Sequence, residues 1–280
     1  MRVTVAGVDI DQLREVDVVE RVAVALAHGV GGRIVTPNVD ILRLARCDPG
    51  VRVHLADATL VVPDGAPVVW VSRLAGTPLP ERVTGADLIW SLSRRVARDR
   101  RSVYLLGGRP ADGATASGAW RAAKALVDAC PGLRIAGAAS PERGFDRHPV
   151  RWSQVCADLI EAKPDLVFVG LGFPRQEEVI TRLRPDLPGA WFLGCGAAIN
   201  FVAGDSVRAP RWMRRSGLEW LWRLAEEPRR LGRRYLRHDV PYALRLLAAT
   251  GAGRLRRELC RGRVAAGDVE RRGAPRGERR

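Results

Sequence analysis

Residues 59–65 read TLVVPDG, and residues 66–76 continue as APVVWVSRLAG. The first run predicts a short buried strand that Pro63 ends, and the second predicts an apolar helix after a turn at Asp64 and Gly65. The Asp64 carboxylate is then expected at the carboxyl end of an interior strand. Ligands of open α/β sheets bind at that edge, so this stretch indicates a fold class and a candidate catalytic residue together.

The alternation of strands and helices extends over residues 1–204. Apolar runs that predict strands lie at residues 3–8, 33–35, 101–106, 132–138, 166–170 and 191–193. The later runs are continuous, which is typical of a parallel sheet covered by helices on both faces. We therefore expect a Rossmann-like α/β catalytic domain. Asn38 is expected to cap one of its helices, and Thr84 with Asp87 fits a capping box.

The composition indicates the cellular compartment in which the protein functions. The chain has 280 residues with 46% hydrophobic content, enough for a substantial core. Its five cysteines are scattered, without a CxxC pair or zinc-ligand spacing, which favours a reducing compartment. No apolar run reaches the roughly 18 residues that indicate a membrane span, and no signal peptide is recognised. We therefore expect a cytoplasmic location.

The net charge of +15 is concentrated near the end of the chain. Residues 205–280 carry 21 arginines against nine acidic residues, whereas residues 1–204 are nearly neutral. Residues 205–250 interleave tryptophan with arginine, which predicts a helical appendage that docks peripherally on an anionic membrane surface. An ordinary amphipathic helix packed on the core and a nucleic-acid patch are the alternatives. Residues 251–280 are expected to be disordered.

Polar side chains follow the early strands. If those strands are neighbours, Thr36, Asn38 and Asp64 converge on one crevice. A positioned carboxylate can take the proton of a sugar hydroxyl as it attacks an anomeric carbon, so Asp64 is the candidate general base. A plain turn residue at Asp64 and a plain helix cap at Asn38 remain alternatives.

Three glycine turns after strands predict a nucleotide crevice, because glycine lets backbone N–H groups approach phosphate. Gln176 is placed to hydrogen-bond a base or sugar. The alternatives are an ordinary strand-to-helix turn for the glycines and a solvated residue of the first helical turn for Gln176. Asp9-Ile10-Asp11 is interpreted as a turn, and no metal ion is expected in the site. The turns comprise Gly107-Gly108, Gly170-Leu171-Gly172 and Gly194-Cys195-Gly196.

Seven runs together resemble the WecG/TagA/CpsF glycosyltransferases, glycosyltransferase family 26. The likeness covers about residues 1–247, in order, and implies a fold of the GT-E type. It also implies inverting transfer from a UDP-sugar to a polyprenyl-diphosphate-linked sugar acceptor at the cytoplasmic membrane face, for teichoic acid or another cell-surface polysaccharide. The runs are TPN (36–38), PDG (63–65), RVTGADL (82–88), YLLGG (104–108), GLGFPRQE (170–177), GCGAAINFVAG (194–204) and the basic block at 208–236.

The resemblance also implies roles for particular residues. Asp64 matches the proposed base, and Thr36 is expected to be catalytic with it. Thr36 and Asn38 match residues lining the acceptor and donor pocket, and Arg82 and Gln176 match substrate-binding residues of the same cleft. Many members carry a carboxylate where this chain has Asn200, which puts any charge-based role of that position in doubt. The appendage would bring arginines to the diphosphate, and the candidates are Arg211, Arg214 and Arg223.

The donor sugar is left open between an N-acetylmannosamine type and another hexose or uronic acid. No cofactor is expected beyond the UDP-sugar, no nucleic acid is expected as a partner, and a homo-oligomer stays open. Two other classes are weighed against the transferase: a Rossmann-type nucleotide-dependent enzyme, whose GxGxxG motif is absent, and a non-catalytic nucleic-acid-binding module.

Overall fold

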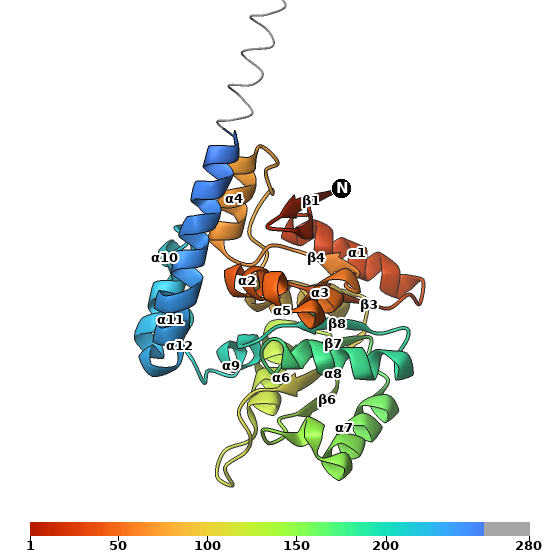
Figure 1. Cartoon of the computed structure of the whole chain (residues 1–280). Helices are drawn as coiled ribbons and strands as arrows, with labels where there is room; N and C mark the ends of the chain where they lie inside the picture. Colours follow the sequence, from red (N-terminus) through yellow and green to blue (C-terminus); the bar gives the residue numbers. More distant parts are fainter. Residues whose placement is uncertain (255–280) are drawn as a thin grey trace, which may run out of the picture.

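The computed structural model describes residues 1–254, and its centre is a six-stranded sheet in which every pairing is parallel (Figure 1). The strand order is β4-β3-β8-β7-β5-β6. This arrangement confirms the predicted Rossmann-like fold. The strands are β3 (Gly32–Val35), β4 (Leu60–Val61), β5 (Ser102–Gly107), β6 (Arg134–Ala139), β7 (Leu166–Gly170) and β8 (Trp191–Gly194).

Helices cover both faces of the sheet because successive strand residues are apolar on both sides. Ile34 and Leu60 belong to the core cluster on one face, while Val35 and Val61 belong to the cluster on the other. The first face is covered by α1 (Glu15–Ala27), α5 (Gly85–Arg98), α6 (Gly118–Ala129) and α9 (Ala198–Val202). The second is covered by α2 (Val39–Cys47), α3 (Pro49–Ala56), α7 (Pro149–Ala162) and α8 (Arg175–Leu183).

The first residues form a separate antiparallel hairpin of β1 (Arg2–Val5) and β2 (Val8–Asp11). The prediction of one strand over residues 3–8 is therefore wrong. The chain reverses at Ala6 and Gly7, whose φ values of 52° and 82° suit a two-residue hairpin turn. The interpretation of Asp9-Ile10-Asp11 as a turn is also wrong, because these residues lie in β2.

The strand that precedes Asp64 lies at the edge of the sheet, which corrects the expectation of an interior strand. On its inner side, Val62 N–H donates to the Val35 carbonyl oxygen (3.0 Å). On its outer side, Val61 N–H donates to Asp11 Oδ2 (2.9 Å), so the hairpin satisfies the free edge. Because β4 is buried although it lies at the edge, its residues are as apolar as those of an interior strand.

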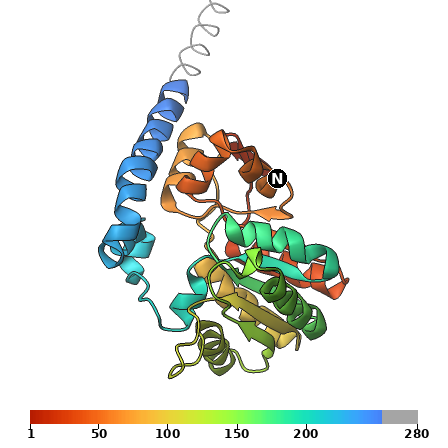
Figure 2. The ribbon, with the colours of Figure 1, turned by 60° about the horizontal axis from the view of Figure 1, so that its bottom comes forward.

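A helical appendage follows the sheet and confirms the predicted C-terminal helices. It contains α10 (Arg211–Arg215), α11 (Glu219–Glu226), α12 (Pro228–Arg234), the π-helix η3 (Tyr235–Asp239) and helical residues 240–254. Figure 2 shows these helices alongside the α/β domain. Tyr242 and Leu246 pack into the core cluster of α2, α3 and α4 (Ala66–Ala75).

Residues 251–254 continue the last helix of the appendage, and the remainder of the tail predicted as disordered lies outside the described residues. Within residues 1–254, no helix combines the length and apolar character needed to cross a bilayer.

Candidate active site

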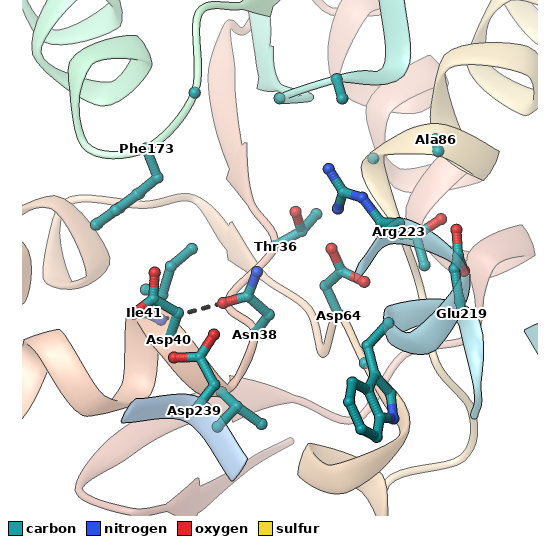
Figure 3. A pocket seen from close by; sticks show the side chains of 18 of the residues that line it. Thr36, Asn38, Asp40, Ile41, Asp64, Ala86, Phe173, Glu219, Arg223 and Asp239 are labelled. Carbon is teal, nitrogen blue, oxygen red and sulfur yellow. Dashed lines mark hydrogen bonds between the residues drawn. The ribbon is translucent and has the colours of Figure 1, made fainter. Parts of the chain in front are cut away.

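A cavity of about 500 Å³ opens at the carboxyl ends of β4, β3, β8 and β7 (Figure 3). The α/β domain forms one wall, and α11, α12 and η3 of the appendage form the other. Most of the predicted site is brought together here. The predicted residues that line the cavity are Thr36, Asn38, Asp64, Arg82, Gly172, Gln176, Gly194, Gly196 and Arg223.

Asp64 lies in the short loop between β4 and α4, and its carboxylate lines the cavity (Figure 3). Its N–H donates to the Pro37 carbonyl oxygen (3.0 Å), which ties the loop after β4 to the loop after β3. Gly65 has a φ of 105°, which strongly favours glycine, and α4 begins at the next residue. The loop that leads the chain from β4 into α4 therefore also places the Asp64 carboxylate in the cavity.

The Asp64 carboxylate forms no hydrogen bond or ion pair with any other residue in the range 1–254. Burial raises its pKa to about 6, because the charged form loses hydration. Arg82 opposes this rise in pKa, and Glu219 adds to it. A half-buried carboxylate with a pKa of about 6 is suited to accepting a proton.

Thr36 and Asn38 follow β3 and bring a hydroxyl and an amide to the same wall. Ile41 N–H donates to Asn38 Oδ1 (3.1 Å), which confirms the predicted cap of α2. The Asn38 amide nitrogen is turned toward Thr36 in Figure 3 and is not used by the cap. Asn38 therefore has a structural contact through its oxygen and a free donor at the cavity.

Gln176 is held in place by two hydrogen bonds. Its Oε1 accepts from Gly196 N–H (3.0 Å), and its Nε2 donates to Glu177 Oε1 (3.1 Å). One N–H of the amide remains for a ligand. A Cβ on Gly194, the last residue of β8, would lie 2.5 Å from Gln176 Nε2, so a larger residue there would displace the Gln176 amide. The side chain that was expected to contact a substrate also anchors the turn after β8.

Two buried charged residues behind this turn were missed in the sequence. The side chains of Arg33 and Glu177 are fully buried, and Arg33 Nη2 lies 3.1 Å from Glu177 Oε2. Arg33 also donates to Asp57 Oδ2 (2.9 Å) and to the His54 carbonyl oxygen (3.0 Å). The available signal was an arginine inside an apolar strand run, since a buried charge requires a partner.

Gly107 and Gly108 do not line the cavity. Gly107 ends β5 and Gly108 follows it. Because β7 separates β5 from β8, both glycines lie farther along the sheet edge. A Cβ on Gly107 would lie 2.5 Å from the Gly170 carbonyl oxygen. This glycine therefore permits a close approach between two strand ends.

Asn200, Arg211 and Arg214 also lie outside the lining of the cavity. Asn200 belongs to α9, and its buried Oδ1 has no hydrogen-bond partner within residues 1–254. Arg211 is exposed on α10, whereas Arg214 Nη1 lies 3.7 Å from an Asp87 oxygen. Of the three predicted diphosphate-binding arginines, only Arg223 reaches this wall.

The appendage contributes charges of both signs to the cavity, and most were not predicted. Arg82 Nη1 donates to Glu219 Oε2 (2.7 Å), which joins the segment before α5 to α11. On the opposite side, burial and the neighbouring Asp40 raise the pKa of Asp239 to about 7. The proximity of Arg82 to Glu219 and of Asp40 to Asp239 could not be predicted from the sequence, because these residues meet only when the appendage packs against the α/β domain. The missed lining residues include Asp40, Glu219, Arg230, Arg234 and Asp239.

The fold and the site define an α/β enzyme with its ligand site at the carboxyl edge of a parallel sheet. A sequence model of the glycosyl transferase WecG/TagA/CpsF family matches residues 3–256. The chain belongs to this family and is a glycosyltransferase. The resemblance seen in the sequence is confirmed, and the two alternative classes are set aside.

Several of the most similar relatives carry the name N-acetylglucosaminyldiphosphoundecaprenol N-acetyl-beta-D-mannosaminyltransferase. The Bacillus spizizenii enzyme is 35% identical over 206 residues, covering 73% of this chain and 75% of the relative. The Bacillus subtilis enzyme is 31% identical over 223 residues, covering 78% and 80%. A Staphylococcus aureus enzyme is 28% identical over 234 residues, covering 83% and 87%.

Proposed function

We propose that this glycosyltransferase moves N-acetylmannosamine from a UDP-sugar to N-acetylglucosamine on a polyprenyl diphosphate. The names of the relatives support both the transferred sugar and the lipid-linked acceptor. The product would enter a cell-surface polymer such as teichoic acid or an exopolysaccharide. The observation that carries the proposal is the unpartnered Asp64 carboxylate, whose raised pKa suits a general base.

In the proposed reaction, Asp64 takes the proton of the acceptor hydroxyl as its oxygen bonds to the anomeric carbon. The bond from that carbon to the β-phosphate oxygen breaks on the opposite face, so the anomeric centre inverts and UDP leaves. Thr36 and Asn38 are placed beside Asp64 to orient sugar hydroxyls.

Arginines offset the negative charge that develops on the leaving group. Arg223, Arg230 and Arg234 line the appendage wall of the cavity. Fixed positive charge in a partly desolvated site stabilises a developing diphosphate anion strongly. We therefore propose that transfer requires no divalent ion, which an assay in excess chelator tests: loss of transfer that added magnesium restores would contradict this part.

The appendage is also the proposed membrane contact, at the cytoplasmic face. It exposes Trp212, Leu236 and Leu244 beside numerous arginines. Aromatic and aliphatic side chains enter the interfacial region of a bilayer, while guanidinium groups bind lipid phosphates. Such docking would bring the lipid-linked acceptor to the cavity.

The deciding experiment is a transfer assay with a short-chain lipid-diphosphate N-acetylglucosamine acceptor. UDP-N-acetylmannosamine is compared with UDP-N-acetylglucosamine, UDP-glucose and UDP-glucuronic acid, and products are identified by mass spectrometry. We expect transfer of N-acetylmannosamine to exceed that of the other sugars. Preferred transfer of another sugar would correct the donor, and no transfer from any UDP-sugar would overturn the proposed function.

A further inference from the structure

The carboxylate of Asp64 is unpaired although arginines surround it. Arg82, Arg208 and Arg223 all act electrostatically on Asp64 and favour its charged form. Yet none of them forms an ion pair with it among the described residues. Since a carboxylate in a partly desolvated cavity normally attracts a nearby guanidinium, something must hold these arginines elsewhere.

Glu219 of the appendage holds two of these arginines. Its Oε2 accepts from Arg82 Nη1 (2.7 Å), and its Oε1 lies 3.4 Å from Arg208 Nε. The side chains of Glu219 and Arg82 are only 15% and 19% exposed, so solvent screens this pair weakly. Both carboxylate oxygens of Glu219 are thus occupied by arginines that act electrostatically on Asp64.

Arg208 is fixed a second time by the start of α5. It donates to Asp87 Oδ1 (2.6 Å) and to Asp87 Oδ2 (2.9 Å), in a two-pronged contact. Its Nη2 also lies 3.3 Å from the Thr84 hydroxyl. Arg208 consequently keeps partners when Glu219 is removed, whereas Arg82 has no other ion-pair partner within residues 1–254.

We propose that Glu219 is a positioning residue that keeps Arg82 from pairing with Asp64 and so preserves Asp64 as a free base. The inference rests on the proposed function, in which Asp64 accepts the proton. It assigns a specific role to an acidic residue of an otherwise basic appendage. Docking of α11 therefore completes the site by adding a negative charge as well as positive ones.

Glu219 raises the pKa of Asp64 both directly and through Arg82. The charged groups that face Asp64 are Arg82, Arg208 and Arg223, with Glu219 as the one anion among them. Glu219 disfavours ionisation of Asp64 directly, and it also occupies Arg82. Without Glu219, its negative charge would be lost and Arg82 would be released to pair with Asp64, so the pKa of Asp64 would fall and its carboxylate would become a weaker base.

The first test compares the pH dependence of transfer in the wild type, Glu219→Gln and Glu226→Gln. Glu226 provides a matched control because it is exposed on the same helix and the substitution removes the same charge. We expect the acid limb of Glu219→Gln to move about 1–3 pH units lower, with a reduced plateau, whereas Glu226→Gln follows the wild type. Glu219→Asp, which keeps the charge, should restore the limb partly. An acid limb unmoved in Glu219→Gln would overturn the inference.

The second test needs no activity. The difference in melting temperature between Asp64 and Asp64→Asn is measured against pH, once in the wild-type background and once with Glu219→Gln. We expect the difference to be smaller and to level off at a lower pH when Glu219 is absent, because the folded-state pKa of Asp64 then lies closer to its ordinary value. A difference of the same size and pH dependence in both backgrounds would overturn the inference. Failure of the proposed function is recognised separately, because Asp64→Asn alone would then retain transfer with Glu219 intact.

Discussion

Arg33 Nη2 and Glu177 Oε2 lie 3.1 Å apart, and neither side chain reaches solvent. The pair spans from β3 to α8, and Glu177 in turn accepts from the amide of Gln176. It therefore connects the interior of the sheet to a side chain that lines the cavity. Removing Glu177 leaves the buried Arg33 with Asp57, whose side chain is 48% exposed, as its remaining ion-pair partner within residues 1–254.

We expect Glu177→Gln to lower the free energy of unfolding by about 3–5 kcal/mol, as is typical when a buried pair is broken. Urea denaturation measures the loss. Glu142→Gln is the matched control, because Glu142 pairs with Arg151 at the surface and its loss should cost at most about 1 kcal/mol. Equal losses in the two variants would contradict a structural role for the buried pair.

The Asp64→Asn variant should lose transfer activity by about 10²–10⁴-fold while retaining its fold, since an amide cannot accept the proton. Initial rates at saturating donor, together with circular dichroism, separate these two properties. Asp128→Asn provides the control, because Asp128 is an exposed residue of α6. Near-normal turnover in Asp64→Asn would remove Asp64 from the role of base.

The same substitution should stabilise the protein in a pH-dependent manner. The pKa of Asp64 is about 6 in the folded state against an ordinary value of 3.8, so the folded protein binds this proton more tightly than the unfolded chain. Burying the ionised carboxylate therefore costs stability above about pH 6, and this cost disappears as the pH falls toward about 4.

Calorimetry of the wild type and Asp64→Asn across this range measures the effect. We expect Asp64→Asn to be more stable by on the order of 1–3 kcal/mol at about pH 8, and equally stable at about pH 4. Asp239, whose pKa is also raised, is present in both proteins and cancels in the difference. A stability difference that is independent of pH would contradict the raised pKa.

Association with anionic vesicles should depend on Trp212. Its side chain is 64% exposed on α10, and burying a large apolar side chain contributes about 1.5–3 kcal/mol. We expect Trp212→Ala to weaken binding by about tenfold or more in a vesicle sedimentation assay. Trp120→Ala, on the α/β domain and 54% exposed, should bind like the wild type. Equal weakening by both would show that the appendage is not the membrane contact.

Local chemistry made much of the fold predictable from the sequence. Asn38 and Thr84 were identified as caps because a side-chain oxygen one residue before a helix can accept a hydrogen bond from an unpaired N–H of the first turn. The hairpin was missed because residues 3–8 form one β-rich run, in which the reversal at Ala6 and Gly7 leaves only a weak signal. Gly7 readily adopts the positive φ that this turn needs, but alanine at position 6 is not a typical turn residue.

The candidate site was predictable where residues follow strands and unpredictable where distant elements meet. Asp64 and Thr36 were found because parallel strands end at a common edge. Glu219 was not, since its role depends on Arg82, which lies far away in sequence and meets it only after the appendage packs. Periodicity carries information about neighbours along an element, whereas such a pair is a property of the assembled tertiary structure.

The hydrogen bond from Val61 N–H to Asp11 has a consequence for self-association. A further strand can pair with a sheet through unpaired backbone N–H and C=O groups on an edge strand. At β4, the Asp11 carboxylate already accepts from one of these N–H groups. The other margin is β6, at the opposite end of the strand order from the segment that carries Asp64. Two copies that fused their sheets into one would meet at β6, and the cavity beside Asp64 would stay open in each copy.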